Sequence, residues 1–259
     1  MFLKKEKPMM QITETVKQLI IINIIFFVGS YFVPEAQAYL PMYFFENPLF
    51  QFWQPVTSMF MHGGVMHILF NMFALFMFGS TLEQFWGAKK FLFFYISCGL
   101  GAALVHQGVN YLEFQSAYMV LLENGLTPSE INVLLEEGSV RAANTSSNET
   151  EIQNAVNTIS GAYRIPVVGA SGAIYGILVA FAFMFPNVEL MMMFIPIPIK
   201  AKYFVPGILL IDLISGLNGG SIFGASTGIA HFAHLGGALT GFLIMWYWKK
   251  NSFNQNRWN

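Results

Sequence analysis

The sequence predicts an all-α membrane protein, a bundle of six transmembrane helices forming a single domain over residues 1–259. Apolar residues make up 55% of the chain and charged residues only 10%, and the mean hydropathy is +0.53. A soluble domain carries about 25% charged residues. Six apolar stretches approach the roughly 20 residues that a helix needs to cross the hydrocarbon core. Basic residues gather in the segments between alternate stretches, as they do in polytopic membrane proteins.

The six expected helices cover residues 16–33, 64–82, 91–109, 167–185, 203–217 and 229–248. The first expected helix follows a lysine-rich N-terminus. It is not followed by a small-residue cleavage site and a soluble domain, which favours a retained helix over a signal peptide. The fifth is short, and Pro196, Pro198 and Pro206 leave its start open because proline interrupts helices.

The basic residues predict the orientation of the bundle. With six crossings, both termini and the loops near Lys89 and Lys200 share one side, and that side holds all but Arg141 and Arg164 of the 13 basic residues. Cytoplasmic loops carry the excess of Lys and Arg, so we expect a multi-pass protein of the inner (cytoplasmic) cell membrane with both termini in the cytoplasm. The second, fourth and sixth helices then enter from the outer face.

Four polar side chains fall near one level of the outer leaflet. At about 1.5 Å per residue, Ser171 and His234 lie roughly 7 Å below the outer starts of their helices. His67 has a similar depth, and Asn71 lies one turn deeper on the same helix face. Side chains at this depth are hydrated only if the helices enclose a cavity that opens to the outer face. A nucleophile and a base held there suggest a protease that works inside the bilayer.

Small residues indicate which helices meet. Gly172 and Gly176 on the fourth helix, and Gly237 and Gly241 on the sixth, form small-xxx-small patterns. These patterns let membrane helices approach closely, which a short serine side chain needs in order to reach an imidazole.

At these residues the chain resembles the rhomboid family of intramembrane serine proteases. The resemblance runs from about Phe52 to Trp248, except for the polar segment at residues 110–164. It rests on three motifs in the order and on the helices that the family uses. The motifs are Gly169-Ala170-Ser171-Gly172 with Tyr175, Ala233-His234-Leu235-Gly236-Gly237 with Gly241, and His67-Ile68-Leu69-Phe70-Asn71.

The resemblance implies a Ser-His dyad without a carboxylate. Ser171 would attack the substrate carbonyl and His234 would take its proton. The side chains of His67 and Asn71 and the backbone N–H of Ser171 would stabilise the oxyanion. Tyr175 would stack on the His234 ring in place of an aspartate. The implied substrate is a single-pass membrane protein cut in or near its transmembrane helix, with no cofactor, metal or nucleic acid involved.

Two polar segments lie outside this core on the outer side. Residues 110–164 form a partly helical insertion between helices 3 and 4, with short amphipathic helices at 119–122 and 131–135 and a loop at 144–148. An inert insertion and a role in substrate selection both remain open. Residues 216–228 are rich in Gly and Ser, and the resemblance implies a mobile cap over the active site.

Two further polar residues in the apolar stretches have no assigned role. Asp212 is an acid in the fifth apolar stretch without an evident partner. His231 lies three residues before His234, on nearly the same helix face. Lining the cavity and pairing with a neighbour both stay open for it.

Three other kinds of protein are alternatives to the protease. A catalytically silent rhomboid-like protein would bind transmembrane helices without cutting them, and the presence of both Ser171 and His234 argues against it. A transporter would be expected to have inverted repeats, and none is recognisable in the sequence. A zinc protease would be expected to carry the motif His-Glu-x-x-His, which is also absent.

Overall fold

The computed structural model describes residues 11–137, 148–192, 195–218 and 230–251. The longer helices are α1 (Glu14–Phe32), α4 (Val65–Ala74), α5 (Ser80–Trp86), α6 (Ala88–Glu123), α7 (Pro128–Glu137), α8 (Glu149–Arg164), α9 (Ser171–Met184), α10 (Ala201–Leu217) and α11 (His231–Asn251). The short elements are α2 (Pro34–Tyr39), α3 (Gln54–Thr57), the 3₁₀ turn η1 (Ser58–Phe60), the π turn η2 (Leu75–Gly79), and strands β1 (Glu189–Met192) and β2 (Ile195–Lys200).

The protein is a helical membrane bundle. Within the described residues, three segments are long and apolar enough to cross a membrane, Glu14–Phe32, Val65–Trp86 and Ala88–Glu123, and Ser171–Met184 is a shorter apolar helix. The second of these segments joins α4, η2 and α5 without a break. Helices α10 and α11 stand where the fifth and sixth apolar stretches predicted them, and the count of six crossings stays a prediction.

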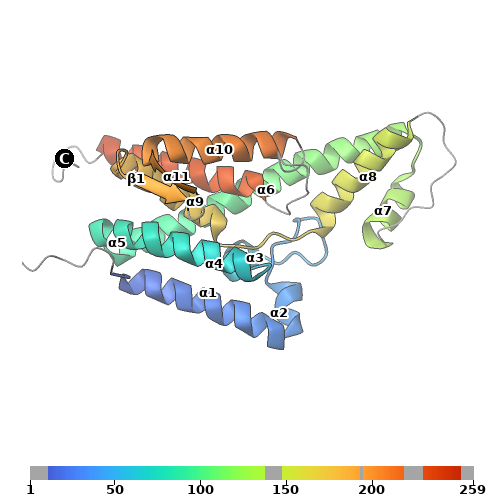
Figure 1. The fold of residues 1–259 in the computed structure, drawn as a ribbon. Coiled ribbons are helices and arrows are strands. Elements are labelled where there is room, and N and C mark those ends of the chain that lie inside the picture. Colours follow the sequence, from blue (N-terminus) through green and yellow to red (C-terminus); the bar gives the residue numbers. More distant parts are fainter. Residues whose placement is uncertain (1–10, 138–147, 193–194, 219–229, 252–259) are drawn as a thin grey trace, which may run out of the picture.

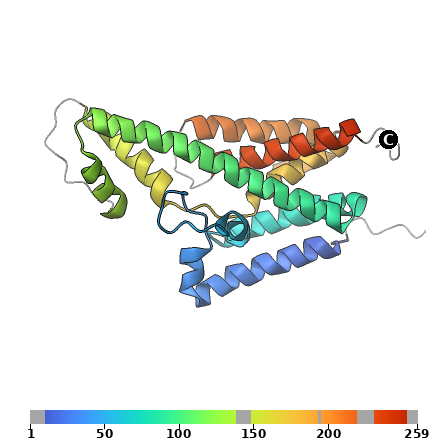
Figure 2. The same cartoon turned by 180° about the vertical axis from the view of Figure 1, so that it is seen from behind.

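The helices run side by side, and the turns that connect them lie at the two ends of the bundle (Figure 1). The start of α1, the turn between α5 and α6, and the end of α11 lie at one end, and α7 and α8 lie at the other. Seen from behind, α6 runs past the bundle toward α7 and α8 (Figure 2). The lysines at 89, 90, 249 and 250 therefore share one end of the molecule.

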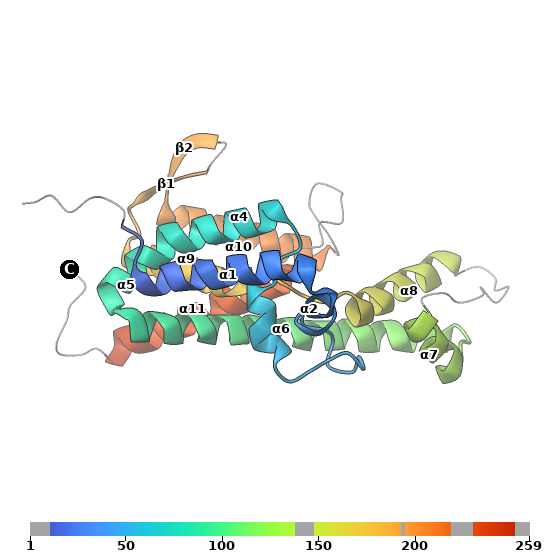
Figure 3. The same cartoon turned by 90° about the horizontal axis from the view of Figure 1, so that it is seen from below.

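A short β-hairpin departs from the all-α expectation. Strands β1 and β2 pair antiparallel, with Glu189 opposite Lys200, and project from the bundle before α10 (Figure 3). Prolines at 196 and 198 explain the extended backbone, because proline fixes φ and disfavours a helical residue before it. The start of α10, left open by the sequence, is Ala201, and Pro206 lies inside that helix.

The third helix is much longer than expected. The prediction ended it near residue 109, but α6 continues to Glu123, so residues 119–122 are its last turn and not a separate helix. The extension packs against α7, α8 and the segment before α3 in a small core of its own. Fully buried members include Leu121, Ile131, Leu134 and Ile159. Residues 131–135 lie in α7 as expected, and most of the expected loop at 144–148 lies outside the described residues.

The fourth helix begins later than its apolar run. Residues 165–170 are not helical: Met42 and Val167 exchange two backbone hydrogen bonds, and the Gly169 N–H donates to the Ser58 carbonyl at 2.9 Å. Ser171 is therefore the first residue of α9, whereas His234 is the fourth residue of α11. The expectation that both lie equally deep below their helix starts is wrong for Ser171, because the apolar residues before it pair with another segment.

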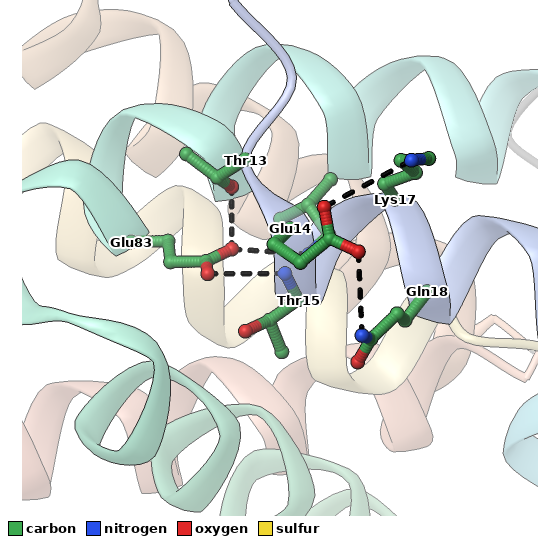
Figure 4. Close-up of polar contacts among 7 residues, drawn as sticks. Thr13, Glu14, Thr15, Lys17, Gln18 and Glu83 are labelled. Atoms are coloured by element: carbon green, nitrogen blue, oxygen red, sulfur yellow. Dashed lines mark hydrogen bonds and ion pairs between the residues drawn. The ribbon is translucent and has the colours of Figure 1, made fainter.

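Glu83 ties the start of α1 to α5 (Figure 4). One carboxylate oxygen accepts from the Thr15 N–H at 3.1 Å, and the other accepts from the Val16 N–H at 3.0 Å and from the Thr13 hydroxyl. The first N–H groups of a helix have no acceptor inside it, and a negative charge there is favourable. Glu83 thus caps α1 from a different helix while only 6% exposed.

We expect Glu83→Gln to lower the free energy of unfolding by about 1–2 kcal/mol, because charged hydrogen bonds are stronger than neutral ones and the amide adds an unpaired donor. The measurement is unfolding in mixed micelles titrated with SDS. Glu14→Gln is the matched control, since the Glu14 side chain is 71% exposed in the same turn of α1. Equal stability of the two variants would contradict the cap.

Candidate active site

Helices α9 and α11 are in backbone contact through their glycines. A Cβ added to Gly237 would overlap the Gly172 carbonyl, and one added to Gly241 would lie 2.7 Å from the Gly176 Cα. Both small-xxx-small patterns therefore face each other, as the sequence suggested. This close approach sets the distance between the side chains at the start of each helix.

Ser171 and His234 lie within hydrogen-bond distance across this contact. The Ser171 Oγ is 2.9 Å from the His234 Nε2. Ser171 is the first residue of α9, and His234 lies in the first turn of α11. A hydroxyl this close to an imidazole nitrogen has the geometry of an activated nucleophile.

Tyr175 covers one face of the His234 ring. The two ring centroids are 4.1 Å apart and their planes differ by 12°, a stacked arrangement. Tyr175 lies one turn after Ser171 on α9, so the same helix carries the hydroxyl and the ring that restrains its partner. The stacking that the resemblance implied is present in the structure.

The structure brings Asp212 to the site, although no partner for it was evident from the sequence. The Asp212 Oδ1 lies 2.6 Å from the His231 Nδ1 and 3.3 Å from the His234 Nδ1. An acid in an apolar stretch is itself a signal of function. The partner depends on how α10 packs against α11, which spacing along the chain does not reveal.

His67, on α4, lies next to Gly169, two residues before Ser171. Its Nδ1 faces the Gly63 N–H at 3.4 Å, so its Nε2 carries the proton of the neutral ring. A Cβ on Gly169 would lie 2.8 Å from the His67 Nε2 and 3.5 Å from the Ser171 Oγ. Gly169 also has a φ of +125°, a backbone conformation that only glycine adopts easily.

Asn71 and the start of α9 add further donors. Asn71 is 6% exposed, and within the described residues its Nδ2 has no hydrogen-bond partner. A buried amide without a partner is costly unless something occupies it. The first N–H groups of α9, beginning with Ser171, also lack acceptors inside the helix.

The other two histidines surround the same region. The His62 ring contacts the His67 ring edge-on at 5.1 Å, and His106 is within hydrogen-bond distance of Asn110, at 3.2 Å. Burial, with His67 close by, lowers the pKa of His62 to about 4, so His62 is neutral at pH 7. Among the described residues, no three His, Cys, Asp or Glu side chains form a possible metal site. Most of the expected cap, residues 219–228, lies outside the described part of the chain.

The chain is similar to known proteins. A family model described as the Rhomboid domain matches residues 49–120 and 138–251. The rhomboid protease AarA of Providencia stuartii is 27% identical over 195 residues, 74% of this chain and 54% of its own. An uncharacterized mitochondrial rhomboid protein of Schizosaccharomyces pombe is 26% identical over 220 residues, 78% of this chain and 53% of its own. The chain thus spans about half the length of these relatives.

Proposed function

Because the chain belongs to the rhomboid family, we propose that it is an intramembrane serine endopeptidase that cleaves single-pass membrane proteins in or near their transmembrane segment. The observation that carries the proposal is the 2.9 Å separation of the Ser171 Oγ and the His234 Nε2 across the α9–α11 contact. Similarity to AarA, which is named a protease, supports the same assignment.

The proposed reaction is acyl transfer followed by hydrolysis. The Ser171 Oγ bonds to the substrate carbonyl carbon while its proton passes to the His234 Nε2. His234 then gives that proton to the leaving amine as the peptide bond breaks, which leaves an ester on Ser171. Water then attacks the ester carbon while losing a proton to His234. His234 returns this proton to the Ser171 Oγ as the bond between Oγ and the carbonyl carbon breaks, which releases the acid product and restores Ser171.

The oxyanion formed in each half of the reaction needs donors already in position. We assign this role to the His67 Nε2–H, the Asn71 amide and the backbone N–H of Ser171. The protonated Nε2 of His67 beside Gly169, and the unpartnered amide of Asn71, support the assignment. Gly169, Gly172, Gly237 and Gly241 have supporting roles, since each permits an approach that a side chain would block.

We propose six crossings, by α1, α4–α5, α6, α9, α10 and α11, in a cell membrane, with both termini in the cytoplasm. The lysine-bearing ends of α6 and α11 share one end of the bundle, which supports this orientation. The segment with α7 and α8 then lies on the outer side. We treat residues 110–164 as an insertion within a single domain.

The test is cleavage of a panel of tagged single-pass substrates in proteoliposomes, together with labelling by a fluorophosphonate. Wild-type protein is expected to cleave at least one substrate and to be labelled, and Ser171→Ala is expected to do neither. If folded wild-type protein neither cleaves nor is labelled, the protease proposal fails. A silent protein that binds transmembrane helices would then take its place.

A further inference from the structure

Asp212 contacts the proposed dyad through His234, and the Ser-His mechanism leaves it unused. It lies on α10, is 5% exposed, and its Oδ1 is within hydrogen-bond distance of two imidazoles. A buried carboxylate is costly unless its charge is compensated by hydrogen bonds or partners. Here the partners are His231 and His234, both on the first turn of α11, together with the Tyr175 side chain on α9.

These contacts determine which ring nitrogen of His234 carries the proton. An ionised carboxylate only accepts hydrogen bonds, so the Nδ1 of His231 and the Nδ1 of His234 must both donate to Asp212. With its proton on Nδ1, a neutral His234 presents a free lone pair at Nε2, toward the Ser171 hydroxyl. This is the tautomer that a general base acting on Ser171 requires.

We propose that Asp212 is a positioning residue for His234, so that the protein works with a Ser171–His234–Asp212 unit in place of a dyad. The inference rests on the proposed function. Tyr175 fixes the plane of the His234 ring by stacking. Asp212 fixes its rotation and tautomer, and its negative charge stabilises the imidazolium that forms when Ser171 attacks.

His231 holds the carboxylate in place. Its contact with the Asp212 Oδ1 is the shorter of the two, 2.6 Å against 3.3 Å. The His231 Nε2 is buried and has no partner within the described residues, so Asp212 is the contact that the structure gives this side chain. His231 acts one step further from the reacting atoms than Asp212, and losing it is expected to cost less.

The test compares Asp212→Asn with wild type in proteoliposomes, measuring kcat and the substrate mole fraction at half-maximal rate. Asparagine has the same shape but offers an amide donor to Nδ1, which favours the wrong tautomer. We expect kcat to fall about 100-fold, the lower range for general base catalysis, with the half-saturating mole fraction within about twofold. The rate of Ser171 labelling by a fluorophosphonate should fall in parallel.

Three further variants separate positioning from packing. Ser215→Ala alters a buried residue one turn later on α10 and is expected to stay within about threefold of wild type. Asp212→Glu restores the carboxylate and should be more active than Asp212→Asn. His231→Ala should lose less than Asp212→Asn. Thermal unfolding of each purified variant shows whether it is folded.

Several results would overturn the inference while the protease assignment stands. One is a folded Asp212→Asn variant whose kcat is within threefold of wild type, and another is a change in the half-saturating mole fraction alone. The others are equal losses of kcat for Asp212→Asn and Asp212→Glu, or a loss for His231→Ala as large as that for Asp212→Asn. If Asp212→Asn does not fold, the kcat values of Asp212→Glu and His231→Ala, compared with each other and with wild type, test the inference. Absence of cleavage and labelling in the wild type would instead remove the proposed function and the inference with it.

Discussion

Replacing Ser171, His234 or both residues by alanine is expected to lower kcat for substrate cleavage by the same factor, about 10⁴ to 10⁶. The two side chains act in one step, because the 2.9 Å contact between Oγ and Nε2 carries the proton that leaves as the nucleophile attacks. Once either partner is missing, the other has no reaction to assist. The losses are therefore not additive.

The measurement is the initial cleavage rate of the three variants in proteoliposomes at saturating substrate, with labelling by a fluorophosphonate as the second readout. Ser80→Ala is a matched control, because Ser80 is a buried membrane serine, 5% exposed, on a different helix. It should cleave at nearly the wild-type rate. Thermal unfolding of all the variants checks that the bundle is intact.

Two outcomes would contradict the shared role. If the double variant lost the product of the two single losses, Ser171 and His234 would act independently. If His234→Ala kept more than a few per cent of the wild-type rate, another base would be at work. His231, held three residues away by the same carboxylate, would be the first candidate to test.

The parts of the site that the sequence predicts are those that depend on local helical spacing. His67 and Asn71 lie one turn apart on α4, and Ser171 and Tyr175 lie one turn apart on α9, so each pair follows from chain order. The paired glycines also identify α9 and α11 as neighbours, since close approach has a composition signature. These inferences needed no knowledge of how distant segments pack.

The parts that were missed depend on packing between distant segments. Asp212 precedes His234 by 22 residues and reaches it only because α10 lies against α11. The late start of α9 follows from the pairing of Met42 with Val167, more than 120 residues apart. The extension of α6 is helical because α7 and α8 cover it, and its sequence alone looked like a polar insertion. An apolar sequence indicates that a segment is removed from water. It does not show whether lipid or another segment of the protein covers that segment.

Gly237→Ala is expected to separate the active-site helices. A Cβ at this position would overlap the Gly172 carbonyl, and backbone atoms cannot move aside as a flexible side chain can. Overpacking of this kind costs about 1–3 kcal/mol of stability. Helix α11 carries His234 and α9 carries Ser171, so the shift also lengthens the contact between them. Displacements of about 1 Å cost roughly 100-fold in rate, and we expect a loss larger than that.

Gly108→Ala supplies the matched control, because Gly108 lies inside α6 with nothing within 4 Å of an added Cβ. There alanine should stabilise the helix by about 0.5–1 kcal/mol and leave cleavage unchanged. Thermal unfolding and initial rates of both variants, measured in the same liposomes, test the comparison. If Gly237→Ala behaved like Gly108→Ala, the approach of α9 and α11 would not be limiting. The geometry of Ser171 and His234 would then have to be maintained by the Tyr175 stack and by Asp212 rather than by the backbone contact.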